Sequence, residues 1–153
     1  TDIVKKEYTY RIYNSRLGNA FYVNRAWFYP KHLDEQVMQR AADQFVGTHD
    51  FAAVRSVGTD VKSTVRTVYY YQVERQGNLI LLRVCANGFL YNMVRILAGT
   101  LLAVGMGRLE PKAVAAIIAG KDRRAAGQTA EPQGLTLLEI FYDEKDLYGA
   151  AKN

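Results

Sequence analysis

The sequence predicts an α+β domain in which helices cover one face of an antiparallel sheet. Several segments alternate apolar and polar residues, which is typical of half-buried strands. Other segments carry apolar stripes at helical spacing, and turn residues separate the two kinds. The resulting order of strand, helix, paired strands, helices and strand is that of an α+β arrangement. We find no internal repeat and no linker, so residues 1–153 are expected to form a single domain.

The first half of the chain is predicted to hold a strand, a helix and an exposed loop. Residues 7–14 alternate as a strand, and residues 21–29 are aromatic and expected to be extended. A helix over 33–46 follows, because its apolar residues share one stripe and Gly47 stands just past its end. Residues 55–64 carry Ser, Gly, Asp, Lys and Thr and are predicted to form an exposed loop.

The second half is predicted to hold a hairpin, two helices and a last strand. Residues 65–74 and 79–86 are expected to pair, because Gly77 between them supplies the backbone dihedrals that such a turn needs. A long helix is expected from about Leu90 to Val104. The remaining predicted elements are a helix from Pro111 to Ala119, a polar, basic loop over 121–133 and a strand over Leu135–Tyr142.

Composition excludes several classes of protein. Hydrophobic residues make up 49% and charged residues 23% of the chain, which is ordinary globular usage and excludes disorder. One cysteine excludes a disulfide framework, and together with two histidines it leaves too few ligands for a nitrogen–sulfur metal site. The most apolar stretch, residues 93–106, is too short to cross a bilayer, and no signal peptide precedes it, so we expect a cytoplasmic protein. Because the chain begins with Thr1 rather than methionine, we expect a processed protein or a piece of one.

Arg95 is the most informative single residue. It lies within a predicted helix that is otherwise mostly apolar, and an unpaired buried charge costs several kcal/mol. One interpretation is that Arg95 bonds a structural carboxylate or extends its head group to solvent. The other is that it orients a catalytic carboxylate and keeps it ionised.

Tyr8 and Tyr10 share one face of the first predicted strand. They either pack in the sheet or offer a stacking surface to a nucleobase. Three other polar candidates are given structural roles instead. We interpret Asp60 as a solvated loop residue, His49-Asp50 as a helix exit with an Asx turn, and Cys85 as a packing residue.

The net charge of +5 is compatible with a polyanionic partner. The basic residues of two predicted loops either solvate the surface or grip phosphates. They are Arg55, Lys62, Arg66, Lys121, Arg123 and Arg124. No phosphate-binding glycine loop, catalytic triad or metal-ligand spacing accompanies them, so an independent catalyst cannot be assembled from these residues.

Four stretches of sequence resemble one known family. They are Tyr8-Thr9-Tyr10-Arg11-Ile12-Tyr13-Asn14, Gly47-Thr48-His49-Asp50-Phe51, Ala86-Asn87-Gly88-Phe89-Leu90-Tyr91-Asn92-Met93-Val94-Arg95 and Gly127-Gln128-Thr129-Ala130-Glu131-Pro132-Gln133-Gly134-Leu135. In this order they resemble the C-terminal half of the tRNA pseudouridine synthase A family. The resemblance implies a ferredoxin-like, RRM-like half of the pseudouridine synthase fold.

The resemblance also implies a function. Members of this family are homodimers that isomerise uridine to pseudouridine in the anticodon stem-loop of tRNA (positions 38–40 by the tRNA convention), with no metal or organic cofactor. Their nucleophile is an aspartate of an Arg-Thr-Asp-Ala-Gly motif in the N-terminal half. No such motif exists here, since Gly58-Thr59-Asp60 falls in the wrong half. This chain alone is therefore expected to be inactive and to need the N-terminal half of the same protein as its partner.

By the same resemblance, four residues have expected roles. Tyr8 would contact the flipped uracil, Arg95 would pair with the absent aspartate, Leu135 would form an apolar wall and Phe89 would support the pocket. Asn92 departs from the histidine of many relatives, and its role stays open. Two alternatives to an isomerase remain: a non-catalytic RNA-binding module, motivated by the charge and the tyrosines, and a dimerisation domain.

Overall fold

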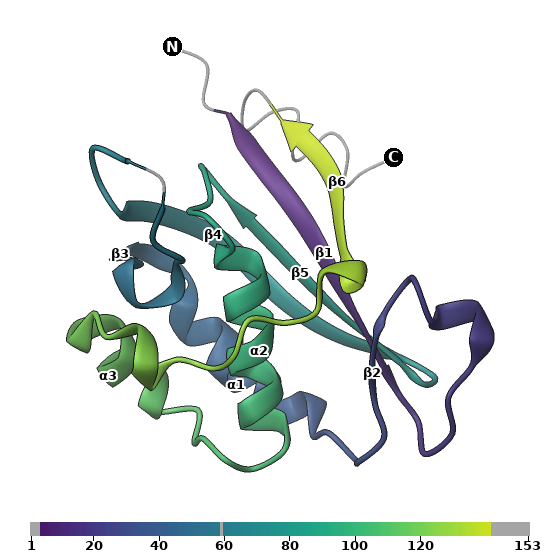
Figure 1. The fold of residues 1–153 in the computed structure, drawn as a ribbon. Helices are drawn as coiled ribbons and strands as arrows, with labels where there is room; N and C mark the ends of the chain where they lie inside the picture. The colour runs from purple at the N-terminus through teal and green to yellow at the C-terminus, as the bar shows by residue number, and fades with distance from the viewer. Residues whose placement is uncertain (1–3, 59, 142–153) are drawn as a thin grey trace.

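The computed structural model describes residues 4–58 and 60–141 and contains one mixed sheet with helices packed against it (Figure 1). Its strands are β1 (Lys5–Asn14), β2 (Trp27–Tyr29), β3 (Gly47–Asp50), β4 (Val65–Gln76), β5 (Leu79–Ala86) and β6 (Leu135–Phe141). Its helices are α1 (Glu35–Phe45), α2 (Met93–Gly105) and α3 (Ala113–Gly120). Short 3-10 turns are η1 (Ala20–Tyr22), η2 (Ala52–Val54), η3 (Arg123–Ala125) and η4 (Pro132–Gly134).

The sheet is mostly antiparallel, in the order β2-β1-β5-β4-β3. Strands β2 and β6 share one edge of β1: β2 pairs in parallel with residues 12–14, and β6 pairs antiparallel with residues 5–10. Only the β1–β2 pair is parallel in the described part of the chain. The predicted α+β class is therefore confirmed.

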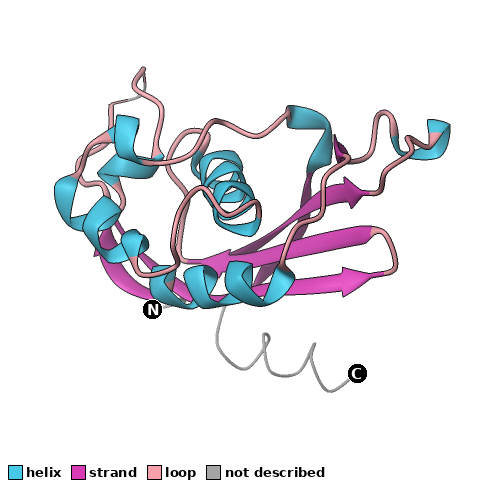
Figure 2. Ribbon diagram, turned by 90° about the horizontal axis from the view of Figure 1, so that it is seen from below, coloured by secondary structure: helices cyan, strands magenta, loops and turns pink. Residues whose placement is uncertain are grey.

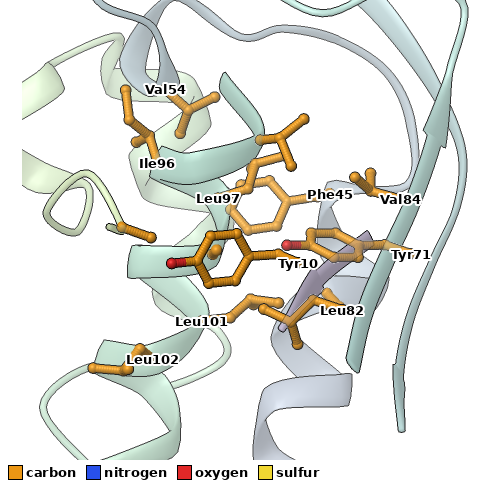
Figure 3. Close-up of a cluster of buried hydrophobic side chains, with 14 of the residues drawn as sticks. Tyr10, Phe45, Val54, Tyr71, Leu82, Val84, Ile96, Leu97, Leu101 and Leu102 are labelled. Atoms are coloured by element: carbon orange, nitrogen blue, oxygen red, sulfur yellow. The ribbon is translucent and has the colours of Figure 1, made fainter. Parts of the chain in front are cut away.

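One face of the sheet and the helices enclose the hydrophobic core. Alternation along the strands puts Tyr10 of β1 and Leu82 of β5 on this face, in register with each other. In Figure 3 these side chains lie beside Phe45 of α1 and Leu97 of α2. All four are fully buried, and Figure 2 shows α2 against the sheet. The prediction that helices cover one face of the sheet is thus confirmed.

The predicted hairpin and helices are confirmed, with small shifts at their ends. Gly77 adopts φ +60° in the turn between β4 and β5. Helix α1 begins two residues later than predicted because the Asp34 side chain accepts hydrogen bonds from the first-turn backbone and caps the helix. The predicted last strand is β6; its predicted final residue, Tyr142, lies outside the described residues.

Two local predictions were wrong in part. Residues 21–29 are extended only over Trp27–Tyr29, because the Asn19 side chain accepts a hydrogen bond from Phe21 N and starts the turn η1. Residues 47–50 form strand β3 beside β4, not merely a helix exit. The Asx turn is present, since Asp50 Oδ1 accepts from Ala52 N at 3.0 Å.

Candidate functional site

A pocket of about 410 Å³ opens where α2 begins. Strand β1, the loop after η2, the start of α2 and the first residue of β6 supply its walls. The lining residues are Tyr8, Arg55, Val61, residues 89–95 and Leu135. Tyr8, Phe89, Arg95 and Leu135, which are far apart in sequence, thus share one cavity.

The aromatic and aliphatic wall follows from strand geometry. Tyr8 lies two residues before Tyr10 on the helix-facing side of β1 and is half-buried, whereas Tyr10 is fully buried. The Tyr8 and Phe89 rings meet edge to face, with 5.1 Å between centroids and 89° between planes. Leu135, the first residue of β6, pairs with Tyr10 of the neighbouring strand β1. The wall is therefore apolar and leaves part of the Tyr8 side chain accessible from the pocket.

Arg95 is held in the first turn of α2 by neutral acceptors. Its Nε donates to the backbone oxygen of Ala130 at 2.7 Å, and its Nη1 donates to Asn92 Oδ1 at 3.3 Å. Among the described residues, no carboxylate forms an ion pair with Arg95. Its positive charge is thus fixed in place but not neutralised, and a guanidinium with remaining donors is suited to bind an anion.

The segment that holds Arg95, residues 126–134, crosses α2 at close range, and we call it the strap. A Cβ atom added to Gly99 would lie 1.7 Å from the Gln128 oxygen, so only glycine allows the crossing. Gly127 N donates to Thr100 Oγ1 at 2.9 Å, and Ala130 N donates to Arg95 O at 3.0 Å. These contacts fix the Ala130 carbonyl that receives the Arg95 side chain.

Tyr10 and Arg123 secure the two ends of the strap. The Tyr10 hydroxyl donates to Glu131 O at 2.6 Å, and burial raises the pKa of Tyr10, with Glu131 adding to the rise and Arg95 opposing it. Arg123 Nη1 donates to Gly127 O at 2.7 Å, and its Nη2 donates to Thr129 Oγ1 at 3.2 Å. Tyr10 is thus a core residue, while Tyr8 is the member of the pair that reaches the pocket.

The six basic residues predicted to contact RNA do not form one group. Arg55 lines the pocket, and neither Arg55 nor Lys62 has a hydrogen bond or ion pair within the described residues. The other four have intramolecular partners. Arg66 donates to Ser63 O and Val65 O, Lys121 pairs with Asp50 at 3.4 Å, Arg123 binds the strap, and Arg124 pairs with Asp122 at 3.1 Å.

Cys85, Asp50 and Asp60 are interpreted from the sequence as packing, turn and solvated residues. Cys85 is fully buried, and burial is the main cause that raises its pKa to about 11. Asp50 accepts from the Thr64 hydroxyl at 2.6 Å, and this bond is the main cause that lowers the pKa of Asp50. Asp60 is exposed. Within the described residues, no cluster of three His, Cys, Asp or Glu side chains could hold a metal ion, and no helix is long and apolar enough to cross a membrane.

Sequence reasoning missed several residues of the site. Ala130 acts through its backbone oxygen, for which no side-chain signal exists. Val61 and Tyr91 lie on the pocket wall with 39% and 56% of their surfaces exposed. A tyrosine beside the first turn of an apolar helix is the one signal that could have been noticed.

The fold and the pocket define an α+β domain with an aromatic wall and an unpaired cation, a combination suited to a nucleotide-containing ligand. Comparison with known proteins is more specific. The chain belongs to the tRNA pseudouridine synthase family, whose model matches residues 41–143.

Individual relatives agree with this membership. The tRNA pseudouridine synthase A of Geotalea daltonii is 44% identical over 141 residues, which cover 92% of this chain and 58% of the relative. That of Ruminiclostridium cellulolyticum is 49% identical over 138 residues, covering 90% of this chain and 56% of the relative. The chain therefore spans little more than half the length of the curated relatives it matches.

Proposed function

We propose that this chain is the C-terminal part of a tRNA pseudouridine synthase and forms the substrate-side wall of its active site. The reaction converts uridine to pseudouridine in the anticodon stem-loop of tRNA (positions 38–40). The observation that carries the proposal is Arg95, a fixed guanidinium without a carboxylate partner among the described residues, on the wall of a 410 Å³ pocket. The missing anion is the nucleophilic aspartate of the N-terminal half.

The residues of the pocket fit the needs of this isomerisation. A nucleophilic aspartate must be ionised, and an arginine within about 4–6 Å favours its charged form. The target base must leave the helical stack, which costs a few kcal/mol, and stacking on an aromatic ring such as Tyr8 offsets about 1–3 kcal/mol. Leu135 and Phe89 make the remaining wall apolar, which keeps water from the intermediate while the base turns.

Three further parts of the proposal concern partners and location. The N-terminal part of the same protein supplies the aspartate, tRNA is the substrate, and the enzyme works as a homodimer in the cytoplasm. Arg55 lies on the pocket wall with its guanidinium unpaired among the described residues, and this supports a proposed contact with a phosphate next to the target nucleotide. Lys62 follows Val61 of the same wall and extends this contact.

The test compares this chain with the complete gene product that contains it. During the reaction C5 of the uracil exchanges its hydrogen for a bond to the ribose, so tRNA labelled with tritium at C5 releases tritium to water. We expect release by the complete product and none by residues 1–153 alone. The complete product should exceed this chain by roughly 100 residues, the size of one small domain.

Two results would contradict the proposal. Tritium release by residues 1–153 alone would show that no second part is needed. Tight, salt-sensitive binding of tRNA by the complete product, without any release, would indicate an RNA-binding module instead.

A further inference from the structure

Asn92 adopts an unusual backbone conformation at the entrance to α2. Its φ of 60° and ψ of 10° lie in the left-handed region, and Lys121 is the one other non-glycine residue with positive φ in the described part of the chain. Asparagine tolerates this region better than most residues, but glycine fits it best. The Asn92 side chain does not cap the helix. The backbone conformation therefore favours asparagine over most residues without requiring its amide, and the capping of α2 does not require the amide either.

The side chain of Asn92 instead joins two parts of the pocket. Its Nδ2 donates to Ser56 Oγ at 3.1 Å, and its Oδ1 accepts from Arg95 Nη1 at 3.3 Å. Ser56 N donates in turn to Tyr91 O at 2.9 Å, which ties the loop after η2 to the start of α2. Because the guanidinium of Arg95 can only donate, the amide must present its oxygen to Nη1, and this leaves Nδ2 to donate to Ser56 Oγ, which can accept.

We propose that Asn92 is a positioning residue for Arg95: a neutral amide that orients the guanidinium without neutralising it. The backbone oxygen of Ala130 holds Nε and the Asn92 amide holds Nη1, so the side chain is fixed at two atoms. Both acceptors are uncharged, so the positive charge of Arg95 stays available for an incoming anion. A carboxylate at position 92 would hold Arg95 equally well but would consume that charge.

The consequence for catalysis rests on the proposed function, but the positioning role is tested without it. For residues 1–153 we expect the hydrogen-bonded Nη1 group of Arg95 to rotate slowly and its protons to give resolved NMR signals. We expect Asn92→Gly, which keeps the backbone conformation, to merge the Nη1 proton signals of Arg95. The signals of Arg123, whose Nη1 binds Gly127 O, should be unchanged and serve as the internal control.

Kinetics of the complete gene product give the second readout. We expect Asn92→Gly to lower kcat about fivefold to tenfold, the value of one ordinary hydrogen bond, with KM for tRNA within twofold. Asn92→Asp should lower kcat by at least 100-fold, because its carboxylate pairs with Arg95. A merely structural role predicts loss of thermal stability in both variants and no larger effect for Asn92→Asp.

The outcomes separate the two proposals. Unchanged Arg95 signals in Asn92→Gly overturn the positioning role, whatever the activity. Merged Arg95 signals in a protein whose complete product releases no tritium support the positioning role and overturn the proposed function. Equal kcat for the wild type and Asn92→Asp overturns the claim that the acceptor must be neutral.

Discussion

Gly99→Ala tests whether the strap is what holds Arg95. The added Cβ would lie 1.7 Å from Gln128 O and 2.8 Å from Gln128 C, both of them backbone atoms that no side-chain rotation can move away. To restore ordinary contact the strap must retreat by roughly 2 Å. Such a shift breaks the bonds Gly127 N to Thr100 Oγ1, Ala130 N to Arg95 O and Arg95 Nε to Ala130 O.

The size of the effect follows from these losses. Three hydrogen bonds at about 1 kcal/mol each amount to about 3 kcal/mol, and overpacking adds about 1–3 kcal/mol. Replacing a helical glycine by alanine offsets part of this loss, because it raises the stability of the helix by about 0.5–1 kcal/mol. We therefore expect a loss of about 3–5 kcal/mol, which lowers Tm by roughly 10 °C in a domain of this size.

The assay is thermal unfolding of residues 1–153, with Gly120→Ala as the matched control. Gly120 is the last residue of α3, and nothing lies within 4 Å of a Cβ atom built there. The control should keep its Tm within about 2 °C of the wild type. If Gly99→Ala melts at the same temperature as this control, the strap does not depend on the close crossing at Gly99. The strap would then not be what fixes Arg95.

Two further predictions concern buried and paired polar groups. The Tyr71 hydroxyl is buried and has no hydrogen-bond partner among the described residues, so Tyr71→Phe should raise the free energy of unfolding in urea by about 1 kcal/mol; a loss of that size would reveal a partner. Folding lowers the pKa of Asp50, mainly through the Thr64 hydroxyl. Its contribution to stability is therefore fully present above the unfolded-state pKa near 3.9 and is lost as the pH falls through the lower folded-state pKa. Asp50→Asn should show a smaller loss of Tm on acidification than the wild type, and parallel losses in the two proteins would contradict this.

Much of the fold could be predicted because its signals are local. Gly77 between two alternating segments predicts the β4–β5 hairpin. The apolar residues at helical spacing that end at Phe45 predict the amphipathic helix α1. The segment 21–29 was harder to predict. The Asn19 side chain accepts a hydrogen bond from Phe21 N, so the start of the segment forms a 3-10 turn instead of an extended strand. Such a capping contact competes with strand propensity over a few residues, and pattern alone does not decide which prevails.

The site was only partly accessible from sequence. Arg95 could be singled out because a charge on an apolar helix needs a partner, and the family resemblance brought Tyr8, Phe89 and Leu135 together with it. Long-range contacts carry no such signal. The sequence does not distinguish Arg123, which binds the strap, from Arg55, which lines the pocket, because both are arginines in predicted loops.

The central claim is that Arg95 forms an ion pair with a catalytic carboxylate of the N-terminal part. Turnover by Arg95→Gln in the complete gene product tests this claim most directly. Glutamine keeps a donor for Ala130 O but removes the charge. Breaking a partly buried ion pair costs about 3 kcal/mol, so we expect tritium release to fall roughly 100-fold while binding of tRNA changes little. Full turnover by Arg95→Gln would contradict the claim.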